Sequence, residues 1–252
     1  MIGALLLSFL MQGQPTLLTT EPPSIVAALT HETVEIREDF SGQDLVLYGA
    51  TRGLTIQDEI VVVLRGPGRD LRVMEKQRTF GIWVNSAPLE FEDIPSYYAI
   101  ATSLPLEDIA TPESLAGSGI GLPATLAIRA APTASETGRD IRPYLDAIAR
   151  DGRRDDLYAE AQRGVEILDG GLFRATISLP PLTPVGNYVA EVYLFRDGRA
   201  VASRTASLRV EKAGLERFVY QFAHSMPWLY GLFCVAMAVL AGYVAYVAFN
   251  RR

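Results

Sequence analysis

The chain has 252 residues and a formal net charge of −6, with 23 basic and 29 acidic side chains. The acidic balance and the scattered Lys and Arg argue against nucleic acid as a partner. One cysteine, Cys234, and two distant histidines, His31 and His224, exclude a conventional zinc site and an internal disulfide.

A serine-type catalytic triad would need one of these two imidazoles as its base. His31 lies between two short predicted strands, and His224 lies at the edge of a long apolar run. A loop position and a membrane-interface position account for them more simply. We therefore predict no cofactor, no metal site and no enzymatic activity.

The first predicted element is a ten-residue apolar run at residues 2–11. This length suits the core of a secretory signal peptide and is too short for a membrane span, so residues 1–14 are predicted to be a signal peptide. No Lys or Arg precedes Arg37, and the expected cleavage pattern is missing. A short buried helix or strand is the alternative.

Strand patterns follow from Ser24 to Leu89. They are short runs with partial alternation, bounded by polar or glycine-containing turns, at residues 24–29, 33–36, 44–50, 58–66, 69–77 and 81–86. Five consecutive branched or leucine side chains in the run 58–66 predict a central strand that is covered on both faces.

The middle of the chain, about residues 95–162, is predicted to be a helical insertion. Asp93-Ile94-Pro95 can start a helix, and residues 97–104 carry apolar side chains at helical spacing. The remaining expectations are short helical turns at 105–117, a returning strand at 122–131, a loop at 132–138, and helices at 139–150 and 153–162.

Strands return at residue 165 and continue to Lys212, with hairpin turns at Asp169-Gly170-Gly171 and Asp197-Gly198. Many short antiparallel strands with turns at this spacing predict a mainly β fold, an immunoglobulin-like β-sandwich. Residues 22–212 would form this sandwich region, as one sandwich or two.

The C-terminal part has no charged side chain between Met226 and Phe249, which predicts a transmembrane helix at 226–249. Residues 213–225 read as an amphipathic interfacial segment, and 250–252 as a cytoplasmic tail. Arg251 and Arg252 favour a cytoplasmic C-terminus and a periplasmic sandwich on a single-pass inner-membrane protein. A tail-anchored cytoplasmic protein is the alternative if residues 2–11 are no signal.

Two sets of residues are candidates for interactions. On the span, Ala238, Gly242 and Ala245 belong to a stripe of small side chains that allows close helix packing, or that simply faces lipid. In the sandwich region the set is Lys76, Arg78, Trp83 and Asn85, with Tyr97 and Tyr98 nearby. Trp83 and Asn85 would face a partner if Ile82 and Val84 face the core. Alternatively Trp83 is itself a core residue, covered by the tyrosine-rich helix.

Several segments together resemble a known family: VVVLRGP (61–67), KQRTFGIWVN (76–85), PSYYAIATSLPL (95–106), LFRATISLP (172–180), PVGNYVAEVYLFRDG (184–198) and KAGLERFVYQFAHSMPWLYG (212–231). They are similar to the putative alphaproteobacterial transmembrane protein family, whose members are membrane-anchored and have no established biochemical function. The resemblance implies the architecture and a membrane location. An association of such proteins with sulfite-exporter-type permeases suggests a transporter accessory.

The leading expectation is a protein that makes protein–protein contacts as an accessory subunit of a membrane transporter or assembly complex. Its partners would be the lipid bilayer and an integral membrane protein of transporter type. The alternative is a periplasmic module that binds or senses a small ligand in a pocket lined by Tyr97, Tyr98, Lys76 and Arg78.

Overall fold

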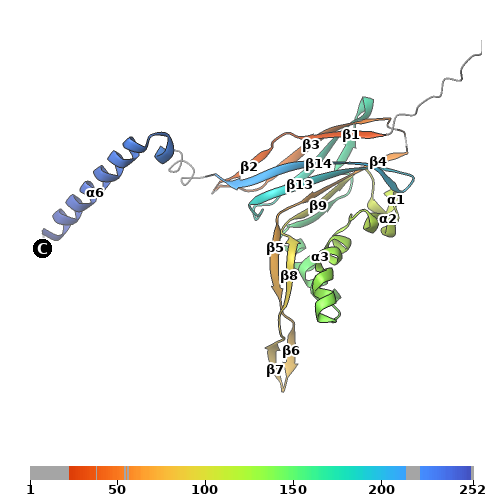
Figure 1. Cartoon of the computed structure of the whole chain (residues 1–252), viewed down its shortest axis with the longest axis horizontal. Helices are drawn as coiled ribbons and strands as arrows, with labels where there is room; N and C mark the ends of the chain where they lie inside the picture. Colours follow the sequence, from red (N-terminus) through yellow and green to blue (C-terminus); the bar gives the residue numbers. More distant parts are fainter. Residues whose placement is uncertain (1–22, 38, 54, 56, 214–221, 251–252) are drawn as a thin grey trace, which may run out of the picture.

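The computed structural model describes residues 23–250, apart from residues 38, 54, 56 and 214–221. The predicted signal peptide, most of the predicted interfacial segment and the two terminal arginines lie outside the described residues. What is described is a mainly β fold with several sheets, one curled into a half-barrel, a helical insertion and an apolar C-terminal helix (Figure 1).

Two sheets enclose the main hydrophobic core. The smaller sheet has the strand order β1 (Ser24–Leu29), β3 (Gln43–Arg52), β12 (Leu172–Leu179), β11 (Val165–Ile167). The larger sheet has the order β10 (Tyr158–Ala161), β9 (Tyr98–Thr102), β4 (Asp58–Arg65), β13 (Gly186–Arg196), β14 (Arg199–Lys212), β2 (Thr33–Ile36).

Strand β4 is the central strand that its sequence predicts. All five side chains from Ile60 to Leu64 are fully buried. The strand pairs with β13 on one side and β9 on the other, so neither edge is open. A continuous apolar run is stable in this position because both faces of the strand are covered.

A two-stranded ribbon leaves the large sheet after β4 and projects away from the two main sheets (Figure 1). Its inner half pairs β5 (Gly68–Val73) with β8 (Leu89–Pro95). Its outer half pairs β6 (Lys76–Thr79) with β7 (Ile82–Asn85). We call residues 68–95 the arm, and the β6–β7 hairpin the arm tip.

The helices of the insertion lie beside the arm and the end of the large sheet (Figure 1). They are α1 (Leu106–Ile109), α2 (Pro112–Gly117), α3 (Leu122–Thr137) and α4 (Arg142–Arg154), with a short turn of 3-10 helix, η1 (Asp169–Gly171), later in the chain. Helix α4 corresponds to the helix expected at 139–150.

Three expectations in the insertion are wrong. Residues 93–104 are not a helix, because β8 ends at Pro95 and Tyr98–Thr102 form β9 between β4 and β10. All five residues of β9 are buried, so burial on both faces replaces the alternation that would identify a strand. Residues 153–162 are not a second helix either, since α4 ends at Arg154 and β10 follows.

The third error concerns residues 122–138, which form the single helix α3 and not a strand followed by a loop. Its buried positions are Leu122, Thr125, Leu126, Ala130 and Thr133, which recur at helical spacing. Pro132 lies inside the helix, where it removes one backbone donor and where we expected a loop to begin. Packing of this face against β8 outweighs that cost.

Helix α6 (Pro227–Asn250) is 24 residues long. Its stretch from Pro227 to Val247 has a mean hydropathy of 1.9 and buries none of its residues against the rest of the described chain. By length and composition it can cross a membrane, in agreement with the predicted span.

Candidate interaction site

The arm tip brings four of the predicted interaction residues onto one face. In the β6–β7 register, Lys76 lies opposite Asn85, and Arg78 lies opposite Trp83. Side chains directly opposite each other in an antiparallel pair point to the same side of the ribbon. The tip therefore presents a tryptophan and an amide together with two cations.

The tip is exposed on both faces. Trp83 is 69% exposed, Ile82 is 67% exposed and Phe80 is fully exposed. The interpretation of Trp83 as a core residue is wrong, and so is the premise that Ile82 and Val84 face the core. The helix that was to cover Trp83 does not exist, because the segment after Pro95 is strand β9.

The turn at the end of the tip places an aromatic ring at its outermost point. Phe80 and Gly81 both have positive φ, 50° and 85°, as a two-residue hairpin turn requires. Asn, Asp or Gly is favoured at the first of these positions, and a bulky side chain is uncommon there. Phe80 thus exposes its ring on a backbone that phenylalanine rarely adopts.

The charge of the tip opposes that of the whole protein. No acidic residue occurs between Lys76 and Asn85, whereas the full chain has a net charge of −6. Neither Lys76 nor Arg78 forms an ion pair with another described residue. The tip is therefore an apolar surface with two uncompensated positive charges.

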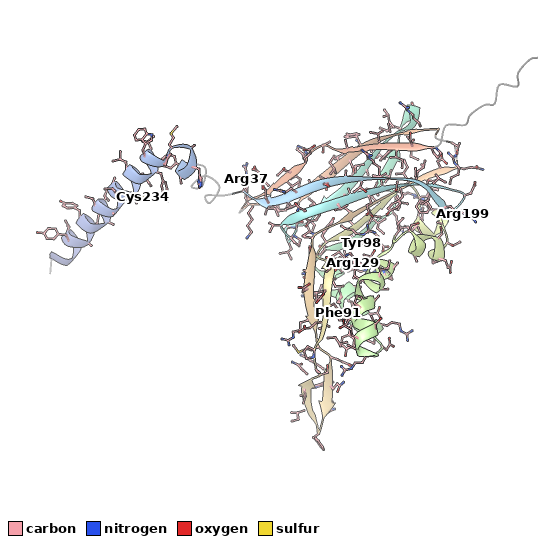
Figure 2. All side chains as sticks on the ribbon, viewed as in Figure 1. Arg37, Phe91, Tyr98, Arg129, Arg199 and Cys234 are labelled. Atoms are coloured by element: carbon pink, nitrogen blue, oxygen red, sulfur yellow. The ribbon has the colours of Figure 1, made fainter. Side chains whose placement is uncertain are left out.

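Tyr97 and Tyr98 do not belong to this surface. Both are fully buried where the arm joins the large sheet, and Tyr98 is labelled in Figure 2. The hydroxyl of Tyr97 donates to the carbonyl of Ser178 at 2.8 Å, and that of Tyr98 accepts from the N–H of Gly121 at 2.9 Å. Burial raises the pKa of both hydroxyls, so they stay neutral and act as core residues.

The root of the arm is held by contacts from the insertion. The ring of Phe91 on β8 lies 6.4 Å from that of Tyr144 on α4. Arg129 of α3 forms an ion pair with Asp93, and Phe91 and Arg129 are both labelled in Figure 2. The hydroxyl of Thr133 donates to the carbonyl of Glu90 at 2.9 Å. The insertion thus fixes the inner half of the arm and leaves the tip free.

Strands β4 and β14, which precede the arm and the candidate membrane helix α6, end at the same end of the large sheet. Strands β4 and β14 both run antiparallel to β13, so they point in one direction. Arg65 at the end of β4 pairs with Val189 on β13. Gly186, three residues earlier on β13, pairs with Val210 near the end of β14. Strand β14 therefore ends at the end of the large sheet from which the arm projects.

The family model described as "Putative transmembrane protein (Alph_Pro_TM)" matches residues 24–251. The chain belongs to this family. The match confirms the resemblance seen in the sequence, and it includes the arm and α6.

Other comparisons add little to the Alph_Pro_TM assignment. A search of curated protein sequences gave no match. Among solved structures, Spo0M, a sporulation control protein from Bacillus subtilis, is similar at 10% identity with a TM-score of 0.27. The alignment covers 82% of this chain, which spans only 56% of the length of that protein. A likeness of this size supports no argument about function.

The small-residue stripe of this Alph_Pro_TM protein lies on α6. Ala238, Gly242 and Ala245 follow each other at helical spacing, within a stretch that buries nothing against the other described residues. Whether these residues contact another helix or lipid stays a prediction.

Sequence reasoning missed a second feature, a groove between β5 and α4. Two adjoining cavities of about 660 and 630 Å³ lie there, bordered by Arg69 and Arg72 from β5 and by Arg150 and Arg154 from α4. The spacing of Arg150 and Arg154 places them on one helix face, which the sequence does reveal. Their position opposite a strand depends on the tertiary fold.

A first prediction concerns the stability of the tip. Replacing Trp83 by Ala should change the free energy of unfolding by no more than about 0.5 kcal/mol, because the ring packs on no core. Thermal unfolding followed by circular dichroism measures this. A large fall in the melting temperature would show that Trp83 supports the fold.

Proposed function

We propose that this Alph_Pro_TM protein is a membrane-anchored accessory protein that binds an integral membrane protein of transporter or assembly-complex type through its arm tip. The observation that carries this proposal is the exposure of Phe80, Ile82 and Trp83 on a hairpin that projects from the main sheets. Exposed aromatic and aliphatic side chains gathered at one site are typical of interaction surfaces. Trp and Arg are also the residues that most often dominate binding energy.

The geometry of the arm suits a partner in the same membrane. From Gly68 to Phe80 the ribbon can reach about 40 Å at roughly 3.3 Å per residue. Its root lies at the end of the large sheet where β14 ends, so the arm starts at the end of the domain that precedes α6 in the chain. Lys76 and Arg78 would favour an acidic patch on the partner.

Site-specific cross-linking tests this role. A photoreactive amino acid at position 80, in the full-length protein in its native membrane, should cross-link to an integral membrane protein. Arg78→Glu should reduce the yield severalfold, because it reverses a charge on the tip. The same photoreactive group at the exposed Ser203 of β14 is the matched control. Cross-links at position 80 to lipid alone, or a yield equal to that at position 203, would exclude the proposal.

We propose further that the β domain is immunoglobulin-like. The two strand orders, β1-β3-β12-β11 and β9-β4-β13-β14, correspond to the A-B-E-D and C′-C-F-G orders of that fold, and β2 runs beside the last strand. The arm is then inserted between strands C and C′, and the helices between C′ and D.

A tyrosine at the start of β13 adds to this comparison. The hydroxyl of the buried Tyr188 donates to the carbonyl of Pro184 at 2.7 Å. A tyrosine near the start of strand F with this backward hydrogen bond is the tyrosine corner of immunoglobulin-like domains.

Tyr188→Phe should therefore lower the free energy of unfolding by about 1 kcal/mol, because it leaves a carbonyl without its donor. Urea denaturation measures the change. Tyr193→Phe, whose hydroxyl bonds the carboxylate of Glu191 in a half-buried site, is the comparison. A change near zero for Tyr188→Phe would show that the hydrogen bond contributes no net stability.

The proposed location is the inner membrane, with the β domain in the periplasm and the C-terminus in the cytoplasm. Arg251 and Arg252 after the span support this orientation by the positive-inside rule. A reporter that is active only in the periplasm, fused after Lys212, should be active. An inactive fusion, with a cytoplasmic reporter active at the same position, would favour the tail-anchored alternative.

The small-ligand alternative receives no support in the form expected from the sequence. Tyr97 and Tyr98 are core residues, whereas Lys76 and Arg78 lie on the arm tip, so the four line no common pocket. The accessory role that we propose needs no catalytic group. Among the described residues, no three of the His, Cys, Asp and Glu side chains gather as metal ligands.

A further inference from the structure

The open edge of β5 faces helix α4 across the groove described above. Strand β5 pairs only with β8 among the described strands, so its other edge is unpaired there. Residues on both faces of this strand line the cavities, because Leu71, Arg72 and Val73 follow each other in sequence. Successive side chains of a strand point to opposite faces, so the groove follows the edge of β5 and not only one face.

The opposite wall is one stripe of α4. Pro143, Ala147, Arg150 and Arg154 recur at helical spacing and line the cavities, and Ala147 and Arg150 border both. The small side chain of Ala147 leaves space midway along the groove. From Gly68 to Val73 the strand has six residues, so its edge is about 20 Å long.

The charges in the groove are uneven. The half beside Arg69 is lined by four arginines and one acidic residue, Asp151. The other half contains Glu75, Asp140 and Asp146, with Arg142 and Arg150. One end of the groove is therefore strongly basic, and the other is close to neutral.

Two of the four arginines at the basic end have no carboxylate partner among the described residues. Arg72 pairs with Glu90 at 3.3 Å, and Arg154 pairs with Asp155 at 3.6 Å. Arg69 and Arg150 form no ion pair with a described residue, and Nε of Arg69 is buried without a hydrogen-bond acceptor. A buried guanidinium nitrogen without an acceptor is costly and would be satisfied by a carboxylate.

We propose that this groove binds an extended polypeptide segment of a partner protein, which adds as a strand to the edge of β5 with its acidic end beside Arg69 and Arg150. Backbone hydrogen bonds to an open strand edge supply affinity that is independent of sequence, and the basic end fixes direction. Charged side chains also protect an open edge against random pairing. Protection of the edge would not require α4 beside it. The helix and the edge together border a groove that has the length of a short strand.

The inference deepens the proposed accessory function and rests on it in one respect, that the partner is a protein. The groove and the arm tip are nevertheless separate sites. A groove variant leaves the tip residues unchanged, so cross-linking from position 80 reports on the tip alone and peptide binding reports on the groove alone.

The test uses the full-length protein in detergent micelles and a random dodecapeptide library displayed on phage. Selection should enrich peptides with two or more acidic residues at one end and apolar residues at alternating positions. Synthetic copies should bind at least tenfold more weakly to the double variant Arg69→Gln with Arg150→Glu. The pair Arg199→Glu with Arg204→Glu, exposed on β14, introduces charge reversals elsewhere and should leave binding unchanged.

Two further readouts identify strand addition. The bound peptide should slow hydrogen exchange at the backbone amides of residues 70–74. N-methylation of alternate peptide amides should abolish binding in one register and spare it in the other. The proposal is overturned if no enriched peptide distinguishes the wild type from the groove variant, or if the bound peptides protect the arm tip instead. Both variants are first checked for an unchanged melting temperature, and Arg150→Gln replaces Arg150→Glu if the reversal alone destabilises the fold.

Discussion

The variant Arg196→Met is expected to lose about 3 kcal/mol of the free energy of unfolding at neutral pH. Arg196 donates from Nε and a terminal guanidinium nitrogen to the two carboxylate oxygens of Asp58, at 2.6 and 2.8 Å. The side chain of Asp58 is fully buried, and that of Arg196 is 28% exposed. Without the guanidinium the carboxylate keeps the hydrogen bonds from Thr55, whose N–H donates at 2.7 Å, but it is then a buried charge without a cation.

The free energy of unfolding that is lost in Arg196→Met should depend on pH, and the ionisation of Asp58 determines the direction. The hydrogen bonds from Arg196 hold the pKa of Asp58 below its usual value of 3.8. In the wild type, this stabilisation is therefore present above about pH 3.8 and is lost as the pH falls through the lowered pKa. In the variant, burial without a cation raises the pKa of Asp58, so acidification relieves the unpaired charge. The difference in free energy of unfolding between the wild type and Arg196→Met should therefore decrease as the pH falls from 7 toward 3.

Urea denaturation at a series of pH values measures this difference. The double variant Asp58→Asn with Arg196→Met should recover part of the lost stability, because no ionised group is then left buried. A difference of the same size at pH 7 and at pH 3 would show that the loss comes from packing of the arginine side chain and not from its charge.

The Asp58–Arg196 pair also shows what sequence reasoning cannot reach. The two residues are 138 positions apart and meet only because β4 and β13 pair in a register that places them opposite each other. Periodicity identifies both strands, but it says nothing about which strand lies next to which. The same limit applies to the groove, since the spacing in α4 is visible while its position opposite β5 is not.

Hydrophobic patterns predicted the secondary structure correctly where one face of an element is exposed, or where an apolar run fits only one kind of element. The apolar helix α6 and the central strand β4 are of this kind. The errors arose where burial removes the pattern: β9 is buried throughout, so Ile100 and its neighbours fit a helix as well as a strand. At the arm tip Lys76, Arg78, Trp83 and Asn85, which the sequence grouped, lie on one face because alternation along a hairpin places them there. It did not single out Phe80, although Phe80-Gly81 stands at the turn.

The second large effect is expected at the root of the arm. Replacing Phe91 by Ala should cost about 3–4 kcal/mol, because this fully buried ring fills the space between β8 and α4 and leaves a cavity when it is removed. Phe91→Leu keeps most of the volume and should cost less than about 1.5 kcal/mol. Chemical denaturation of the two variants gives both values.

The part of the fold that Phe91→Ala destabilises is more informative than the size of the destabilisation. Phe91 joins the ribbon to the insertion, and Leu71 lies opposite it on β5, whereas β13 belongs to a different sheet from the β5–β8 ribbon. Its loss should therefore release the arm, α3 and α4 together as a unit that opens below the global free energy of unfolding. Hydrogen exchange should speed up in β5, β8 and α4 and stay slow in β13. Equal acceleration in β13 would show that the arm and the main sheets unfold as one. If the arm opens separately, cross-linking from its tip should weaken in Phe91→Ala even though no tip residue has changed, because a partner can be held only by a hairpin whose root is fixed.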